Sequence, residues 1–195
     1  MFHVQNTIDF TEKQSALVVG LFEKNKRLEG LLGDLDQALN GQLTELVREG
    51  DISAKFKGIA KIHTFGQTAF KRIFIVGLGK EDELTFTSLR EALGKVSKEL
   101  QVAKLTDVVV AVDAFATADV DVLDVSHAFG EALPLATYKF DGYKKKSNEP
   151  ERKIENVTLV TKHDVEEVKT SVTVGYYYGV GTNSARTLVN LPGNM

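Results

Sequence analysis

Short apolar runs alternate with longer apolar stripes along this chain. The runs at residues 16–22, 72–76 and 107–112 are almost unbroken, which is typical of strands buried on both faces of a sheet. Residues 58–65 alternate apolar and other side chains, as a half-buried strand does, and residues 157–160 indicate a late strand. We therefore expect the three unbroken runs to lie next to one another near the centre of a sheet.

The stripes between these runs predict helices. The first stripe covers residues 28–39, and Asn40-Gly41 interrupts it before Leu43 resumes it. Three later stripes have the same spacing: Leu89, Leu93, Val96 and Leu100; Val122, Val125, Phe129 and Leu133; and Val165, Val168, Val172, Tyr176, Gly179 and Val180.

Residues at the ends of these stripes predict where the helices begin and stop. Ser88 and Glu91 fit a capping box for the helix that contains Leu89, and Pro134 should end or kink the next helix. Asp164 and Glu167 should cap the last helix, which we expect to reach about Asn190.

Alternating strands and helices predict an α/β fold, a three-layer α/β/α sandwich around a mixed, mostly parallel sheet. We place one domain at residues 1–163 and a connecting helix at residues 164–195. The last stripe should pack on the sheet, and beyond Gly181 the helix should leave the domain surface. Gly175, Gly179 and Gly181 each cost a helix about 1 kcal/mol relative to alanine, which fits positions where another element packs closely.

Composition narrows the class of protein. The net charge of -3 argues against a general nucleic-acid binder, and the absence of cysteine excludes disulfides, thiolate metal sites and cysteine nucleophiles. No run approaches the ~20 apolar residues that span a bilayer. Residues 1–11 lack the basic and apolar regions of a signal peptide, so we expect a cytoplasmic protein without membrane association.

The residue groups that could carry chemistry have simpler structural explanations. Gly77-Leu78-Gly79 follows a strand, as a phosphate-binding loop does, but Glu81, Asp82 and Glu83 come next and would repel a phosphate. A structural turn is therefore favoured. The stretch between Lys104 and Lys139 has no basic residue and predicts a solvated acidic face, with Asp119 and Asp121 at a helix N-terminus.

No catalytic constellation is visible in the sequence. The four histidines, His3, His63, His127 and His163, have no metal-ligand spacing, and no Gly-x-Ser-x-Gly motif is present. We therefore predict no catalytic residue, no cofactor-binding residue and no metal ligand in this segment.

One basic cluster could contact phosphates. It contains five cations and two carboxylates, leaving +3, and comprises Lys144, Lys145, Lys146, Arg152 and Lys153 with Glu149 and Glu151. An exposed loop between a helix and a strand is the favoured interpretation.

Several motifs, in this order, resemble those of the two-metal leucyl aminopeptidase family. Residues 75–80 are similar to its Val-Gly-Leu-Gly-Lys signature, and residues 86–92 to its Phe-Thr-x-x-x-Leu-Arg-x-Ala segment. Residues 138–144 match Tyr-x-Phe-Asp-x-Tyr-Lys. Residues 185–194 match the interdomain segment Ala-Arg-Asp-Leu-Val-Asn-x-Pro-x-Asn, with Thr187 where the aspartate usually stands. Gly50-Asp51 and Gly58 resemble the family's Gly-Asp-x-x-Gly-Lys region with wider spacing.

The resemblance implies a macro-domain-like, non-catalytic N-terminal domain that a long helix joins to a catalytic domain. That second domain would hold two divalent ions, manganese or zinc, and would remove N-terminal amino acids such as leucine from peptides. Its signatures are absent here, so we expect this segment to be inactive and cut off before the active site. In the family the domain helps to assemble a hexamer and to shape access to the active site, and in some bacterial members it contributes to DNA binding.

Two other classes stay open. A free-standing macro-like module would bind ADP-ribose or a related nucleotide, but no aspartate follows residues 16–22 and the carboxylates after Gly79 oppose phosphate. The second class is an interaction or DNA-binding module, which the basic cluster with its net charge of +3 supports.

Overall fold

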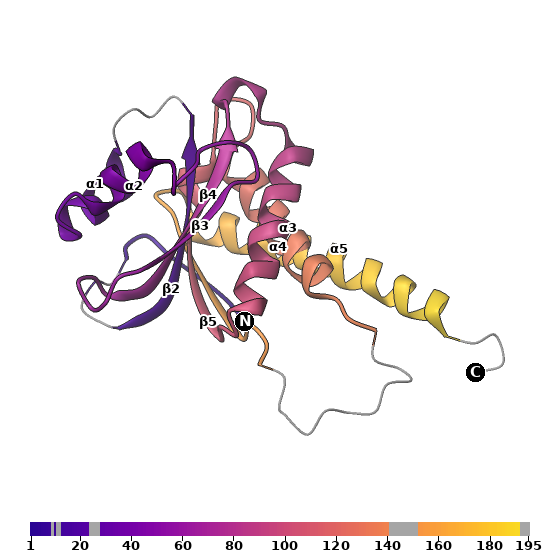
Figure 1. Ribbon diagram of the computed structural model, residues 1–195. Coiled ribbons are helices and arrows are strands. Elements are labelled where there is room, and N and C mark those ends of the chain that lie inside the picture. Colours follow the sequence, from indigo (N-terminus) through magenta and orange to yellow (C-terminus); the bar gives the residue numbers. More distant parts are fainter. Residues whose placement is uncertain (9, 11–12, 24–27, 141–151, 192–195) are drawn as a thin grey trace.

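The computed structural model describes residues 1–8, 10, 13–23, 28–140 and 152–191 (Figure 1). These residues contain a six-stranded sheet in the order β1-β6-β5-β2-β4-β3. The strands are β1 (Phe2–Gln5), β2 (Gln14–Phe22), β3 (Ile59–His63), β4 (Phe70–Gly79), β5 (Asp107–Ala111) and β6 (Asn156–Val160). All neighbouring pairs are parallel except β3 and β4.

The three unbroken apolar runs became β5, β2 and β4, which lie side by side with none at an edge, as expected. Alternate side chains of β2 pack on opposite faces of the sheet. Ala16 and Val18 belong to one core cluster, and Leu17 and Val19 belong to the other. Burial on both faces is the reason why these strands are continuously apolar. The edge strand β1 was not predicted, because its four residues, none of them buried, carry too short a pattern.

Helices cover both faces of the sheet, which confirms the predicted sandwich. Helices α1 (Gly30–Ala38) and α2 (Gln42–Glu49) lie on one face and α3 (Phe86–Val102) and α4 (Val122–Thr137) on the other (Figure 1). Short 3-10 turns, η1 (Glu81–Glu83) and η2 (Val112–Phe115), follow β4 and β5. Asn40 and Gly41 separate α1 from α2 with positive φ angles, as the interrupted stripe predicts.

The predicted cap of α3 and the predicted stop of α4 at Pro134 are wrong, while a kink at Pro134 stays a prediction. The capping box of α3 is formed by Thr85 and Ser88, each accepting a hydrogen bond from the other's backbone N–H, while Glu91 pairs instead with Lys57. Helix α4 does not stop at Pro134 but continues to Thr137. An interior proline removes one donor and crowds the carbonyl four residues earlier, and the packing of α4 against α3 and α5 maintains the helix through this position.

The last helix, α5 (Val165–Asn190), begins as predicted, since the Asp164 carboxylate accepts from the backbone N–H groups of Glu166 and Glu167. Its position differs from the prediction: it packs chiefly on α4 and touches the sheet through the edge strand β1. Val168 and Val172 still reach the main core and are fully buried. In Figure 1 the second half of α5, drawn in yellow, extends beyond the layered body.

Candidate functional site

The described residues contain no cluster of three His, Cys, Asp or Glu side chains that could hold a metal ion. The histidines lie apart: His3 is on β1, His63 at the end of β3, His127 on α4, and His163 just before α5. Three of them are exposed, and His127 contacts the rings of Phe86 and Tyr178. Among the residues that the structure describes, the histidines do not come together into a site.

The Gly77-Leu78-Gly79 motif forms the end of strand β4, so the predicted turn is wrong, and close backbone packing explains its glycines. A Cβ atom at Gly77 would lie 2.2 Å from the carbonyl oxygen of Lys55, and Gly79 has a φ of +75°. The Gly79 N–H donates to the carbonyl of Ala54 at 2.8 Å. The backbone around Ala54 therefore lies directly against the end of β4, and the glycines serve this contact.

The acidic residues have structural roles. Asp121 is the N-cap of α4 and accepts from the Asp124 N–H at 2.8 Å, which confirms the predicted helix N-terminus. Asp113 accepts from the Thr161 hydroxyl at 2.7 Å and the Lys162 N–H at 2.8 Å, joining η2 to the end of β6.

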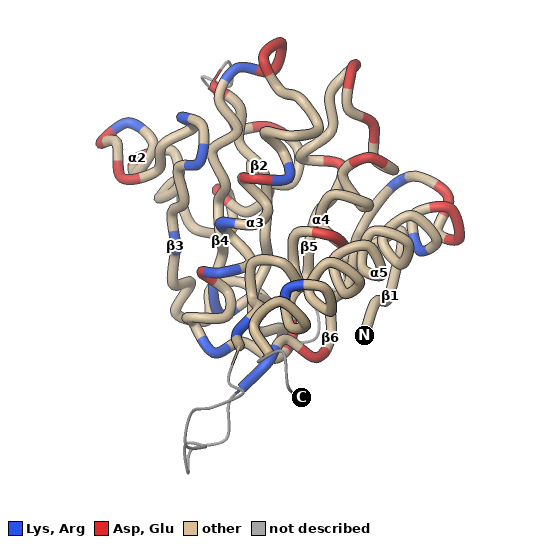
Figure 2. Tube along the Cα trace, turned by 90° about the vertical axis from the view of Figure 1, so that its right-hand side faces the viewer, with Lys and Arg blue, Asp and Glu red and all other residues tan. Residues whose placement is uncertain are grey.

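Basic residues gather at the opposite end of the sheet. Each of the parallel strands β2, β4, β5 and β6 has a lysine near its start, and these are Lys13, Lys71, Lys104 and Lys153. Because parallel strands start at one edge, this end of the molecule is basic, as Figure 2 shows at its lower side. Of the predicted basic cluster, residues 144–151 fall outside the described residues, and Arg152 and Lys153 are described.

One anion at this basic end is held by hydrogen bonds. The Thr106 hydroxyl donates to the Asp107 carboxylate at 2.6 Å, and the Asn156 amide donates to it at 2.8 Å. The bond from Thr106, and to a lesser extent the bond from Asn156, lowers the pKa of Asp107 below its ordinary value of 3.8.

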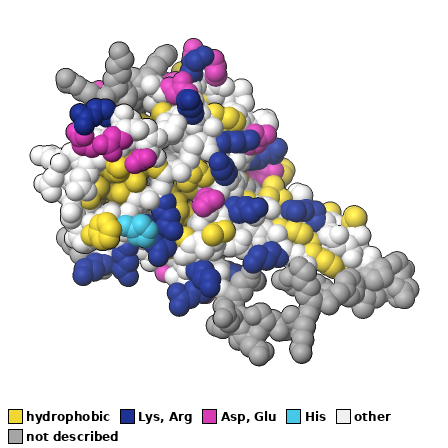
Figure 3. All heavy atoms as spheres, in the orientation of Figure 1, with side chains coloured by type: hydrophobic (Ala, Val, Ile, Leu, Met, Phe, Trp, Pro, Cys, Tyr) yellow, Lys and Arg dark blue, Asp and Glu magenta, His cyan; other side chains and the backbone are white. Residues whose placement is uncertain are grey.

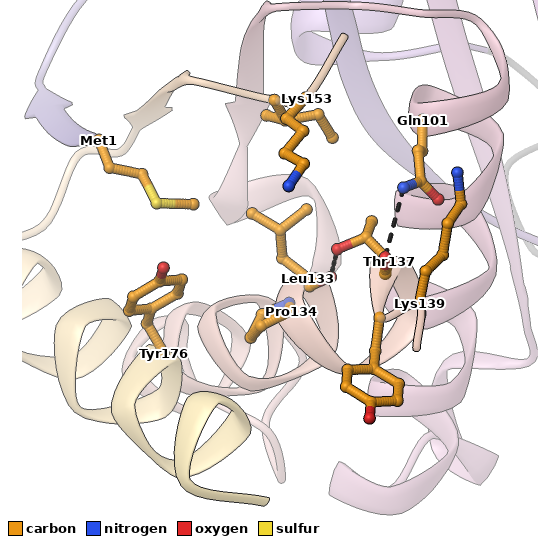
Figure 4. A pocket seen from close by; sticks show the side chains of 10 residues that line it. Met1, Gln101, Leu133, Pro134, Thr137, Lys139, Lys153 and Tyr176 are labelled. Carbon is orange, nitrogen blue, oxygen red and sulfur yellow. Dashed lines mark hydrogen bonds between the residues drawn. The ribbon is translucent and has the colours of Figure 1, made fainter. Parts of the chain in front are cut away.

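A pocket of about 330 Å³ opens at the basic end of the sheet (Figure 4). It lies where β1 and β6 begin and where α3 and α4 end. Its lining comprises Met1, Gln101, Leu133, Pro134, Thr137, Tyr138, Lys139, Lys153, Ile154 and Tyr176. A second, shallower hollow of about 600 Å³ lies near α1 and includes Phe10, Lys13 and Asp34.

Two of the family-like motifs meet at the end of α4. The guanidinium of Arg186 lies 4.2 Å from the centroid of the Tyr138 ring, and the Tyr138 hydroxyl lies 3.0 Å from that of Thr187. We call this set the Tyr138–Arg186–Thr187 contact. It joins residues 49 positions apart, and nothing in the sequence of either motif indicates that the two touch.

Side chains from two other helices satisfy the last carbonyls of α4. Asn183 donates to the carbonyl of Pro134 at 2.8 Å and Arg186 to that of Leu135 at 3.3 Å. Gln101 of α3 donates to the carbonyl of Thr137 at 3.3 Å. Terminal carbonyls of a helix lack partners within the helix, so these three bonds complete α4. Helix α5 thus remains attached to the domain beyond Gly181, through polar contacts in place of an apolar stripe.

Glycines let α4 and α5 cross closely. A Cβ at Gly175 would lie 2.1 Å from the carbonyl oxygen of His127, and one at Gly179 would lie 2.6 Å from that of Glu131. Gly130 of α4 approaches the Val172 carbonyl of α5 in the same way. The predicted close approach is confirmed for Gly175 and Gly179 and is wrong for Gly181, which has nothing within 4 Å.

The outer side of α5 presents large apolar and aromatic side chains to solvent. Tyr177 is 67% exposed, Leu188 is 70% exposed and Val189 is 86% exposed. Figure 3 shows apolar side chains at the surface along the flank where α5 runs toward its C-terminal end. Such a row on one helix is unusual for a surface that stays in water.

The comparisons with known proteins agree on a family. The profile of the cytosol aminopeptidase family, N-terminal domain, matches residues 18–147. A probable cytosol aminopeptidase of Bacillus subtilis (strain 168) is 42% identical over all 195 residues, which span 38% of that relative. This chain belongs to the cytosol aminopeptidase family, peptidase family M17, and corresponds to its N-terminal domain.

Solved structures support the fold. A tomato leucine aminopeptidase variant superposes with a TM-score of 0.81 at 20% identity, over 99% of this chain and 38% of that one. The macrodomain of Thermus aquaticus DarG matches with a TM-score of 0.56 at 12% identity, over 83% of this chain and 98% of that one. These likenesses confirm the predicted macro-domain-like architecture. No helix among the described residues is long and apolar enough to cross a membrane.

Proposed function

We propose that this chain is the non-catalytic N-terminal domain of a cytosolic, metal-dependent aminopeptidase that removes N-terminal residues such as leucine from peptides. Helix α5 would connect it to the catalytic domain. The domain itself would support assembly of a hexamer and shape access to the active site. The chain spans about two fifths of the length of the Bacillus subtilis relative, so the chemistry would reside in the remaining part.

The observation that carries this proposal is the way α5 is attached. Its first half is anchored by the buried Val168 and Val172, and its second half by the Tyr138–Arg186–Thr187 contact. Beyond that contact, Leu188 and Val189 are exposed. A helix fixed at one end with apolar side chains exposed at the other is suited to join two domains in a defined orientation.

The metals would belong to the catalytic domain. The family resemblance implies two divalent ions, manganese or zinc, that activate a water molecule and polarise the scissile carbonyl. The residues described here do not cluster in a way that fits such ions. In this proposal the N-terminal domain acts by position and contact alone.

A chimera tests the proposal. This chain would replace the matching segment of the Bacillus subtilis relative, and hydrolysis of leucine p-nitroanilide would be measured together with the mass of the assembly. We expect hydrolysis and a hexamer like those of the unaltered relative. A folded chimera that is monomeric and inactive would contradict the proposed role.

The alternative of a module that binds ADP-ribose has weaker support. The backbone of residues 53–55 packs on Gly77-Leu78-Gly79 at the end of β4, and Glu81, Asp82 and Glu83 follow it. A pyrophosphate at this end of β4 would meet packed backbone and three carboxylates. Calorimetry with ADP-ribose distinguishes the two functions, and we expect no heat of binding.

A further inference from the structure

The pocket at the basic end of the sheet is lined by both apolar and polar side chains. Leu133 forms its floor and is 2% exposed, and Pro134, Ile154 and Met1 add apolar walls. It draws residues from the start of β1, the segment before β6, and helices α3, α4 and α5. An apolar floor with polar groups at its margin is the usual form of a small-molecule site.

The polar groups of the pocket divide into occupied and available ones. The Gln101 amide donates to the carbonyl of Thr137, and the Thr137 hydroxyl donates to that of Leu133 at 2.7 Å. Within the part of the chain that the structure describes, the Lys153 amine and the Tyr176 hydroxyl have no hydrogen-bond or ion-pair partner. Figure 4 shows the Lys153 amine directed over Leu133 and the Tyr176 hydroxyl directed toward Met1.

These two groups require an acceptor-rich ligand. An ammonium can only donate hydrogen bonds, and a phenol readily donates to an anion. The surrounding lysines add to the attraction, since Lys13, Lys71 and Lys104 lie at the same end of the sheet as Lys153. Leu133, Pro134 and Ile154 add apolar surface to the lining, which suits an aromatic or aliphatic body.

We propose that this pocket binds a small organic anion, a carboxylate or phosphate on a flat apolar body. Lys153 holds the anionic group, and Leu133, Pro134 and Met1 contact the apolar body. The site lies at the starts of the parallel strands, at the end of the sheet opposite to Gly77-Leu78-Gly79 of β4. Binding at this pocket depends neither on the aminopeptidase chemistry nor on the role proposed above for the domain.

The chain offers a direct readout, because it has two methionines and one of them, Met1, lines the pocket. Protein labelled with carbon-13 at the methionine methyl groups is titrated with phenyl phosphate, with inorganic phosphate and with phenol. We expect a saturable shift of the Met1 signal with phenyl phosphate, at a Kd of about 1 mM or tighter, while Met195 serves as internal reference. Inorganic phosphate and phenol should each bind at least about tenfold more weakly, because each lacks one half of the ligand.

Two charge-reversal variants make the test specific. Lys153→Glu should weaken phenyl phosphate at least about tenfold, and Lys71→Glu, the same charge change at the same end of the sheet, should weaken it less than about twofold. Circular dichroism melts check that both variants are folded. The absence of a saturable Met1 shift, or an equal loss in both variants, overturns the site. Equal affinity for inorganic phosphate and phenyl phosphate overturns the ligand class.

Discussion

The guanidinium of Arg186 lies 4.2 Å above the centre of the Tyr138 ring, and this pair fixes the end of α5 to the end of α4. Arg186 also donates to the carbonyl of Leu135, so one side chain both stacks on a ring and completes a helix terminus. A cation beside the C-terminal carbonyls of α4 is further favoured by the helix dipole. The direction in which α5 leaves the domain therefore depends on this pair.

Arg186→Ala should release the last turns of α5. We expect a loss of about 0.5–1 kcal/mol in unfolding free energy, the range of an exposed cation–π pair. The amide hydrogens from Asn183 to Asn190 should exchange faster, while the protection from Val165 to Tyr176 should not change. Arg186→Lys should recover only part of the protection, since an ammonium lacks the planar stacking surface. Unchanged exchange in Arg186→Ala would show that the stack does not hold the helix.

In the unaltered chain, protection along α5 should fall after Thr187. The Thr187 hydroxyl bonds to Tyr138, while Leu188 and Val189 are exposed on the following turn. Hydrogen exchange resolved by residue measures the boundary. Uniform strong protection through Leu191 in a monomer would show that the whole helix belongs to this domain, contrary to the connecting role proposed for it.

Alanine scanning of three glycines separates close packing from helix propensity. Gly175→Ala and Gly179→Ala place a methyl group against backbone oxygens of α4, and should each cost about 1–3 kcal/mol of unfolding free energy. Gly181→Ala faces open space and should stabilise the chain by up to about 1 kcal/mol, because alanine is the better helix former. Urea unfolding measures all three. Equal effects at the three positions would contradict the close crossing of α4 and α5.

Asp107 should make stability depend on pH. Hydrogen bonds from Thr106 and Asn156 hold its pKa in the folded chain below its value in the unfolded chain. The resulting stabilisation is complete above the unfolded pKa, near 3.8, and is lost as pH falls through the folded pKa.

Asp107→Asn should therefore be less stable than the unaltered chain at pH 7, by about 0.5 kcal/mol because the group is largely exposed. The difference should shrink below pH ~4. Urea unfolding at pH 7, 4 and 3 checks this, with Asp119→Asn as a control whose carboxylate accepts no hydrogen bond from the described residues. If the difference in unfolding free energy between Asp107→Asn and the unaltered chain is the same at all three pH values, the Asp107 carboxylate is not the source of the pH dependence.

The layered fold could be predicted because burial leaves a direct trace in the sequence. Strands such as β2 and β4 are apolar on both faces, and Asn40-Gly41 supplies the positive φ angles that separate α1 from α2. Exposed or tertiary features leave weaker traces. Strand β1 is short, and Pro134 is tolerated inside α4 because of packing that only the folded chain provides.

The contacts around the candidate sites could not be predicted at all. The motifs that contain Tyr138 and Arg186 are both legible in the sequence, but their stacking depends on how α5 crosses α4. That crossing is set by Gly130, Gly175 and Gly179, whose partners are backbone atoms without a sequence signature. The pocket beside Lys153 likewise draws on five separate segments of the chain.

The central claim is that this domain contributes position and contact, and that the peptidase chemistry lies elsewhere. The most direct measurement is the hydrolysis of leucine p-nitroanilide by rigorously purified chain, with and without added manganese or zinc. We expect no turnover above the buffer blank under either condition, since the described residues assemble no metal cluster. Metal-dependent turnover that coelutes with the chain through successive columns would contradict the claim.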